Sequence, residues 1–449
     1  MVYIKKRTII ICIILAIALI GLLIWGLSPT TILKPTDDPT QPVAGNNTDM
    51  EMNRVATKSW ANGKWLGDVD KNSITTIIFT NEIFHNVQAS KAWEYDGFTF
   101  AVNSNKDTIT IYVPSGMQMK GSLHGAFQDM TNLQSVTGFA YFDTSECTEM
   151  SSMFANCTSL IAVDAPNLKT DNVLTANKMF FNCASLEHID LTKCNMQKVV
   201  DMSEMFADCF KAINIGLPKT RDVTTFKRAF YQVGMRSSVG TNLIGSLNTQ
   251  NCIDMSEMFA HAMMNDYKVA EQFDTQSLKT AKSMFESCGL KQINLSNWDT
   301  SNLVTTEKMF SENTWSETID VSGWNAEKLE NTSNMFYYCS NLRKLNLNWN
   351  NANTVTDAHS MFMYCFSLIE LNLTGFNNTQ IGITQDMFSG CSELQNIYCT
   401  NITSDVSERM FQHCRKLNGL TPYDENRING AMATTNGYFT QPPTNATAQ

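Results

Sequence analysis

The sequence lacks the motifs that most often carry chemistry. No G-x-S-x-G, H-E-x-x-H, P-loop or Rossmann glycine pattern occurs, and the 6 histidines are scattered without a repeated carboxylate partner. We therefore expect no enzyme activity, no catalytic residues and no cofactor. A basic stripe is also missing, because only 17% of the residues are charged and the net charge is −10. This balance argues against nucleic acid as a partner.

Cysteine motifs are missing too, although cysteine itself is not. The chain has 13 cysteines, but no CxxC pair and no Cys/His cluster at zinc-finger spacing. We therefore predict no metal site. An odd number of cysteines leaves at least one thiol without a partner inside the chain, and their spacing instead follows a repeat described below.

The N-terminus carries a membrane signal. Lys5, Lys6 and Arg7 precede an uninterrupted apolar run over residues 9–27. Nineteen residues in a helix span about 28 Å, close to the hydrocarbon thickness of a bilayer. We predict residues 1–27 to be a cytoplasmic basic stub and a single-pass transmembrane anchor, with the remainder of the chain outside the cell. A cleaved signal peptide is the alternative, and it would make the protein secreted.

Three further segments lie outside the regular part of the chain. Residues 28–59 are dominated by Pro, Thr, Asp and Asn without an apolar period, which predicts a flexible stalk. Residues 60–122 contain "SITTIIFTNEIF", "DGFTFAVNS" and "DTITIYVPSG", which predict strands of a small N-terminal β cap. The Pro-containing residues 441–449 are expected to form a disordered tail.

A repeat of about 26 residues fills residues 123–440. A phenylalanine marks each of about twelve units, and such a period is typical of a solenoid in which each unit buries its apolar side against the next. The markers are Phe127, Phe154, Phe180, Phe206, Phe230, Phe259, Phe285, Phe310, Phe336, Phe362, Phe388 and Phe411.

Each unit predicts one strand, one turn and one short helix or 3₁₀ turn. After the phenylalanine comes an L-x-x-L-x-L pattern, whose alternation is typical of a short half-buried strand. A polar turn and a segment such as "VDMSEMF" come next. There we expect Asp201 and Ser203 to cap a short helix that carries Met205, Phe206 and Cys209. The predicted fold class is an α/β repeat solenoid of short parallel strands and short helices.

A cysteine often stands three residues after the marker phenylalanine. In other units this position holds Met130, Val233, Ala262 or Asn313, which indicates a small buried site rather than a chemical one. Disulfides between neighbouring units stay open as an alternative, and a metal ladder is disfavoured because no His or carboxylate is in register. The predicted core ladder consists of Phe154, Phe180, Phe206, Phe285, Phe310, Phe336, Phe362, Phe388, Cys157, Cys183, Cys209, Cys288, Cys339, Cys365 and Cys391.

Two other positions raise the question of binding. Trp298, Trp324 and Trp349 follow the strands and either pack along the stack or line a binding rim. The outward strand position forms a column of acidic and amide side chains, which is either a solvated face with amide ladders or a ligand surface. Its members, our candidate binding residues, are Asp164, Asp190, Asn294, Asp320, Asn346 and Asn372.

One stretch departs from the period. The units over residues 206–259 have steps of 24 and 29 residues, and "GMRSSVGTNLIGSL" breaks the strand pattern. We expect a bulge or loop there, and we expect this bulge to be the site of a function specific to this protein.

The repeat resembles a known family. "NLSNWDTSNLVTTEKMF" (294–310), "TGFAYFDTSECTEMSSMF" (137–154) and the terminal "NGYFT" are similar to BspA-like leucine-rich-repeat surface proteins of bacteria, which overlap a mycoplasma-type repeat of unknown function. The resemblance implies a right-handed leucine-rich-repeat-like superhelix on the cell surface. Members of that family are associated with adhesion to host proteins and to other cells, and they share no catalytic residues.

These observations lead to one functional expectation and one alternative. We expect a membrane-anchored, surface-exposed repeat protein that binds macromolecules of a host or a neighbouring cell, with an extracellular protein or glycan as its partner. The alternative is a structural or antigenic protein of the cell envelope without a specific ligand.

Overall fold

A computed structural model describes most of the chain. The described residues are 54–82, 89–347, 349–376 and 379–441. The predicted anchor and most of the predicted stalk and tail lie outside them. Within the described ranges, no helix is long and apolar enough to cross a bilayer. Residues Met52–Gln449 form one compact unit, which contains both the cap and the repeat.

The N-terminal part of this unit is a β cap. Its elements are β1 (Arg54–Ala56), η1 (Ala61–Leu66), η2 (Lys71–Ser73), β2 (Thr76–Thr80), β3 (Ala89–Tyr95), β4 (Phe98–Asn103), β5 (Thr108–Tyr112) and β6 (Met117–Met119). β1 pairs with β6, so ordered structure begins inside residues 28–59, which the composition had assigned to the stalk. β2 pairs in parallel with β7 (Ser135–Thr137) of the first repeat unit, so one sheet joins cap and repeat.

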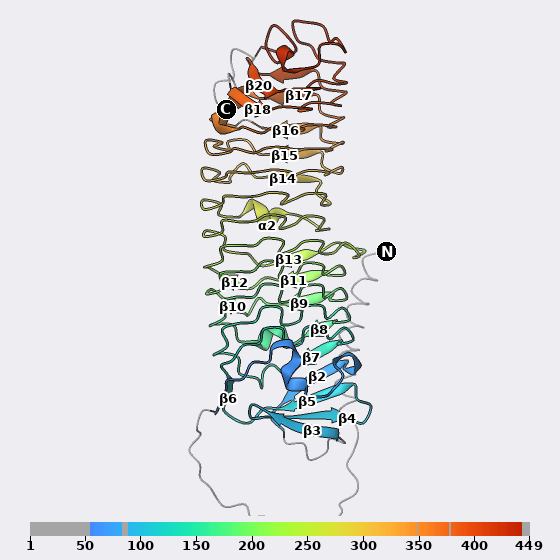
Figure 1. Ribbon diagram of the computed structural model, residues 1–449, viewed down its shortest axis with the longest axis vertical. Helices are drawn as coiled ribbons and strands as arrows, with labels where there is room; N and C mark the ends of the chain where they lie inside the picture. Colours follow the sequence, from blue (N-terminus) through green and yellow to red (C-terminus); the bar gives the residue numbers. More distant parts are fainter. Residues whose placement is uncertain (1–53, 83–88, 348, 377–378, 442–449) are drawn as a thin grey trace, which may run out of the picture. The chain divides into compact units, whose positions relative to one another are not determined.

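The repeat is a stack of coils, most of which contribute a short parallel strand (Figure 1). Neighbouring strands pair residue for residue, as in Ile293 with Ile319 and Ile319 with Leu345, and these apolar side chains are buried. The predicted repeat fold with short strands is thereby confirmed. The strands are β8 (Ala162–Val163), β9 (His188–Asp190), β11 (Asn214–Gly216), β13 (Asn242–Ile244), β14 (Gln292–Asn294), β15 (Thr318–Asp320), β16 (Lys344–Asn346), β17 (Glu370–Asn372) and β19 (Asn396–Tyr398).

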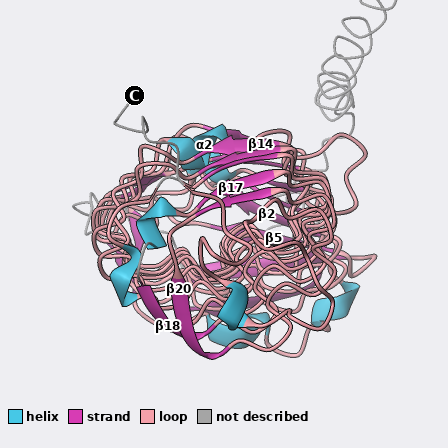
Figure 2. Cartoon of the chain, turned by 90° about the horizontal axis from the view of Figure 1, so that it is seen from above, coloured by secondary structure: helices cyan, strands magenta, loops and turns pink. Residues whose placement is uncertain are grey.

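Seen from above, these strands gather on one side, and loops make up most of the circumference (Figure 2). Shorter elements interrupt the loops. They are β10 (Asn195–Met196), β12 (Lys219–Thr220), β18 (Thr379–Ile383), β20 (Ile402–Val406), η3 (Ala165–Asn167), η4 (Ala352–Thr354), η5 (Thr374–Phe376) and η6 (Gly430–Met432).

The segment that carries the Met-Phe pair is not a helix, so this part of the prediction is wrong. Glu204 and Asp208, two residues before and two after Phe206, both have positive φ. The segment is a run of i→i+3 turns, and positive φ at the third residue is the mark of a type II turn. Asp201 does accept a hydrogen bond from the amide of Ser203, at 2.8 Å, but the bond opens turns instead of a helix.

Hydrogen bonds between coils explain why no helix forms. The amide of Phe206 donates to the carbonyl of Ala229 in the next coil, and Glu204 and Asp208 donate in the same direction. Alternate N–H groups therefore point along the stack, as in a parallel sheet, which is incompatible with i→i−4 bonding inside a helix. Among the described residues the one α-helix is α2 (Lys268–Glu271).

The core is a single file of rings. The twelve marker phenylalanines are at most 2% exposed. Consecutive rings lie 5.1 to 5.7 Å apart between centroids, with planes within 17° of each other. Offset stacking of this kind is a favourable arrangement of aromatic rings. The file therefore fixes the spacing of the coils from inside the stack.

The irregular stretch contains the expected loop, but it does not lose its strand. "GMRSSVGTNLIGSL" keeps its strand, because Asn242–Ile244 (β13) pairs with β11, and the extra residues form a loop that exposes Met235 and Val239. The strand is lost one coil later. There α2 occupies the positions that follow Phe259 at strand spacing.

Candidate binding face

The predicted binding residues lie along the outward side of the strands. Asp190, Asn294, Asp320, Asn346 and Asn372 are the last residues of β9, β14, β15, β16 and β17, and Asp164 follows β8. All of them are partly or fully exposed. The structure brings Asn294, Asp320 and Asn346 together on three adjacent strands, and it places Asp164 and Asp190 on the strands before α2.

Most of these side chains accept hydrogen bonds inside the turn that follows their own strand. Asp320 accepts hydrogen bonds from the amide and the hydroxyl of Ser322, at 3.0 and 2.7 Å, and equivalent bonds close the turns after Asp190, Asn294 and Asn372. Side chains of this type commonly end a strand by such local bonds. The column is thus a set of strand terminators, with part of its hydrogen-bonding capacity already in use.

Asp190 and Asp320 of the column carry charge at neutral pH. Hydrogen bonds from Thr192 lower the pKa of Asp190. Partial burial works against ionisation of Asp320, but hydrogen bonds from Ser322 and Asn346 outweigh it and lower the pKa of that carboxyl. Asn346 lies one strand further and donates to Asp320 at 2.7 Å. The face therefore presents fixed negative charge flanked by amides.

The face is hollowed where α2 replaces a strand. A cavity of about 310 Å³ lies over β14, β15 and β16, and a second of about 630 Å³ lies against α2. Glu271 of α2, Gln292 and Thr318 line both, so the two cavities form one groove. The remaining polar lining comes from Asn265, Asp266, Lys268, Lys291, Asn294, Glu317, Asp320, Lys344 and Asn346.

A hydrogen bond ties α2 to the edge of the sheet. The carboxylate of Glu271 accepts it from the backbone amide of Asn294, at 3.1 Å. β14 is the edge of its three-stranded sheet, and an edge strand needs other groups to satisfy its backbone. Glu271 therefore satisfies one backbone amide of β14 that a neighbouring strand would otherwise pair with. The space beside Glu271 stays open.

A third cavity, of about 450 Å³, lies over the strands before α2. Asp164 and Asp190 line it together with Asn214 and Ile244. Beside it runs a ladder of ring and amide groups: His188 contacts Asn214 at 3.0 Å, and the next members are Asn242 and Asn265. The predicted residues thus divide between two hollows of the same face.

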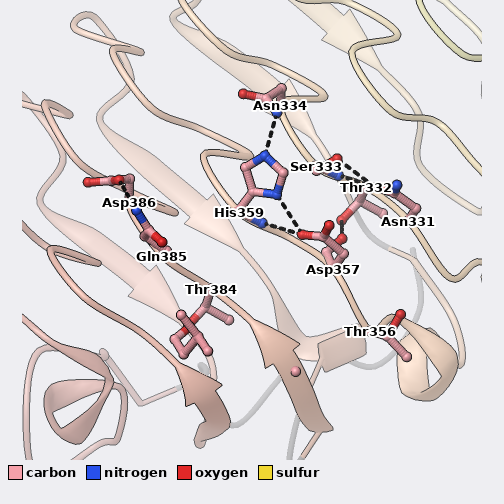
Figure 3. A network of polar contacts seen from close by, with 12 residues as sticks. Asn331, Thr332, Ser333, Asn334, Thr356, Asp357, His359, Thr384, Gln385 and Asp386 are labelled. Atoms are coloured by element: carbon pink, nitrogen blue, oxygen red, sulfur yellow. Dashed lines mark hydrogen bonds and ion pairs between the residues drawn. The ribbon is translucent and has the colours of Figure 1, made fainter.

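A polar network on another face was not expected from the sequence, in which the histidines showed no repeated carboxylate partner. His359 Nδ1 contacts Asp357 Oδ1 at 2.8 Å, and its Nε2 contacts the amide nitrogen of Asn334 at 2.9 Å (Figure 3). The amide nitrogen of Asn334 can only donate, so Nε2 accepts and Nδ1 carries the proton. Both ring nitrogens are engaged, which suits a structural role better than proton transfer. The signal was "DAHS", where other units have "DMSE".

The cysteines of the ladder are buried donors. All twelve described cysteines are free. In the repeated position the thiol donates to the carbonyl of the phenylalanine one coil earlier, as Cys365 does to Phe336 at 3.1 Å, except that Cys288 donates to the side-chain oxygen of Asn313. Asn313 fills the same position with an amide that also bonds the preceding phenylalanine carbonyl. Burial raises the pKa of Cys391 to about 12, so this thiol stays protonated at neutral pH.

The strand-end tryptophans belong to the core. Trp298, Trp324 and Trp349 are at most 4% exposed, and their rings stack at 6.1 and 5.7 Å. Each indole N–H donates to a backbone carbonyl of an earlier coil, for example Trp324 to Leu295 at 2.8 Å. They form a second file of rings and contribute nothing to a binding rim.

Coils of about 26 residues that share a sheet, a file of phenylalanines and a file of tryptophans define a solenoid repeat protein. The chain belongs to the family described as "Mycoplasma protein of unknown function, DUF285", whose model matches residues 121–242, 224–317 and 311–423. The match confirms the resemblance that the 26-residue unit indicated. No curated protein matches the chain.

Two solved structures are similar to this chain. One is a leucine-rich repeat protein from Bacteroides ovatus, with 16% identity and a TM-score of 0.32 over 76% of this chain and 85% of that one. The other is a leucine rich cell surface protein from Faecalibacterium prausnitzii, with 16% identity and a TM-score of 0.31 over 77% of this chain and 98% of that one.

Proposed function

We propose that the protein is a membrane-anchored surface protein whose strand face binds an extracellular macromolecule. The observation that carries the proposal is the groove beside α2. It crosses three strands, its lining is mainly polar, and it contains both carboxylates and ammonium groups. Extended faces of solenoids are common sites for binding other macromolecules.

The lining favours a polar, extended partner. Lys268, Lys291 and Lys344 line the groove together with Glu271 and other acidic residues, so neither a purely anionic nor a purely cationic ligand matches it. A peptide segment with charges of both signs is the best complement.

Binding by the purified full chain tests this proposal. We would measure its affinity for fibronectin, collagen and laminin, together with the variant Lys344→Glu, whose side chain lines the groove. Lys219→Glu in β12 makes the same change of charge outside the groove and serves as the control. We expect saturable binding that weakens at least tenfold in Lys344→Glu only. A folded chain that binds none of these proteins would contradict the proposal.

The predicted anchor supplies the second half of the proposal. Residues 9–27 hold the protein in the cell membrane with the basic residues inside, and the repeat extends outside. Protease treatment of intact cells is expected to remove the repeat and leave an N-terminal fragment in the membrane fraction. Release of the full repeat into the medium without protease would instead indicate a cleaved signal peptide.

A structural or antigenic envelope protein is the second candidate. It is favoured by the local turns that engage Asp190, Asn294, Asp320 and Asn372, since these explain the outward column without any ligand. A deletion strain that has an altered envelope but attaches normally would support this candidate over the first.

A further inference from the structure

An exposed cluster of aromatic rings lies on the turns that directly follow Phe336 and Phe362. Tyr338 contacts Tyr364 and Phe366 with centroids 6.0 Å away in both cases, and Tyr364 lies 5.7 Å from Phe366. Tyr337 adjoins Tyr364 at 5.9 Å. Tyr338 and Phe366 are 40% and 38% exposed. We name these four residues the aromatic platform. It belongs to neither the phenylalanine nor the tryptophan file.

Two platform tyrosines occupy positions that do not favour tyrosine. Tyr338 and Tyr364 both have positive φ, of 56° and 65°. Asparagine, aspartate and glycine tolerate this region best. In the first coils the equivalent positions are indeed Asp129, Asn156 and Asn182. Positive φ recurs at this position in every coil, on residues as different as Gln232 and His261, so it belongs to the repeat and does not require tyrosine. Folding alone therefore gives no reason for tyrosine here.

The neighbouring coil leaves room for the platform. Gly390 holds the equivalent position one coil further, and a Cβ on it would lie 2.5 Å from Cδ1 of Tyr364. The Tyr364 ring therefore extends over the backbone of the next coil. Trp315, which is 67% exposed, belongs to the coil before Tyr338 and adds a further exposed ring to this part of the molecule.

Polar groups adjoin the rings on the same coils. Asn334 and His359 of the network in Figure 3 precede the platform residues by a few positions in their turns. In the coil of Phe230, Arg228 and Tyr231 hold the positions of Asn334 and Tyr337, and there the guanidinium lies 3.7 Å from the ring centroid. The repeat therefore places the Asn334 side chain next to the Tyr337 ring. The hydrogen bond between Asn334 and His359 uses only one N–H of the Asn334 amide, and Figure 3 shows the amide oxygen of Asn334 turned away from the His359 ring.

We propose that the aromatic platform binds carbohydrate. A saccharide ring has apolar C–H faces and polar hydroxyl edges, and it is complemented by exposed aromatic rings with fixed amides beside them. A purely apolar protein segment would not use the amide groups. This inference rests on the proposed function as an extracellular binding protein, and it assigns that function a second surface with its own ligand class.

Binding to polysaccharides tests the assignment. The full chain, purified in detergent, would be titrated with mannan, dextran, hyaluronan and released mucin glycans. The double variant Tyr338→Asn/Tyr364→Asn restores the side chain used in the first coils, so it is expected to fold. Tyr141→Asn removes an exposed tyrosine elsewhere and is the control. We expect binding to at least one glycan, at least tenfold weaker in the double variant and unchanged in the control. All three chains should melt cooperatively, and the double variant should not melt at a lower temperature than the natural chain.

Three outcomes would overturn the carbohydrate assignment. Absence of binding to all four glycans by the folded chain, or equal binding by the double variant, would exclude a carbohydrate platform. Loss of fibronectin, collagen or laminin binding in the double variant would show that the platform is a protein contact. Loss of protein binding in Lys344→Glu alone would leave the strand-face function standing, so the two proposals fail separately.

Discussion

The first coils of the repeat and the coils marked by Phe336 and Phe362 differ at an outward position of a common frame. Two residues after the marker phenylalanine, Asn156 donates to Asp129 at 2.8 Å and Asn182 donates to Asn156 at 3.0 Å, which forms an amide ladder. In the coils marked by Phe336 and Phe362 this position holds Tyr338 and Tyr364. The inter-coil bonds of the marker phenylalanines are alike in the two regions, but the carbonyls of Tyr338 and Tyr364 each accept an additional bond from the amide two residues further. The frame is therefore set by buried rings and inter-coil hydrogen bonds, and the outward position is free to diverge.

The largest expected effect tests whether the frame is equal in both regions. Phe180→Ala and Phe336→Ala each remove a fully buried ring from the file, and each is expected to lower the free energy of unfolding by about 3–5 kcal/mol. Urea denaturation measures both. Phe366→Ala, which removes an exposed ring, is the control and should change it by less than about 1 kcal/mol. A large difference between Phe180 and Phe336 would show that the regions are not equivalent.

Alkaline pH should weaken both regions through their thiols. Burial raises the pKa of Cys157 and of Cys391 from 9.0 to about 12. The unfolded chain therefore loses thiol protons from about pH 9, while the folded chain keeps them. Stability is complete below pH 9 and declines as the pH rises toward 12. Urea denaturation between pH 8 and 10.5 checks this, and Cys157→Ala and Cys391→Ala should each reduce the slope. A flat profile would contradict protonated buried thiols.

Loss of a strand terminator is expected to have a moderate effect. Asp320→Ala removes the acceptor for Ser322 and Asn346 and should lower the free energy of unfolding by about 1–2 kcal/mol. Asp320→Asn keeps an acceptor and should cost less. Because the pKa of Asp320 is lowered, its stabilisation is present above pH 3.8 and is lost as the pH falls through the lower folded value. Thermal denaturation from pH 6 to 2.5 should show a shallower loss in Asp320→Asn than in the natural chain.

The smallest effect bears directly on the divergent position. Tyr364→Asn places a residue that tolerates positive φ, and it should raise the free energy of unfolding by up to about 1 kcal/mol. Asn156→Tyr makes the reverse change in the first coils and should lower it by a similar amount, because it also breaks the amide ladder. Denaturant midpoints measured on both variants decide this. If Tyr364→Asn proved destabilising, tyrosine would have a structural role that the platform proposal does not include.

The fold was largely readable from the period, and the errors in its prediction have physical causes. Burial of Phe336 and Cys365 follows from a spacing that returns the same side chains to the same side of every coil. The helix predicted around Phe206 failed because capping signals such as Asp201 and Ser203 are shared by helices and by Asx turns. Local sequence could not show that the amide of Phe206 bonds to the next coil.

The binding face was only partly readable. The outward column that includes Asp190 and Asp320 followed from strand alternation, but its local bonds and its division between two hollows did not. The groove depends on α2 taking the place of a strand, and on Glu271 reaching the amide of Asn294. Neither contact has a spacing that repeats, so no pattern in the chain announced it.

The sequence by itself determined that this protein is a stack of like units with phenylalanine and cysteine inside, because a unit of 26 residues cannot bury its own apolar side. Only the tertiary structure decided which outward groups meet. Neighbours on the surface are set by the packing of separate coils, so the groove beside Glu271 and the rings of Tyr338 and Tyr364 come together from segments that lie about one repeat apart along the chain.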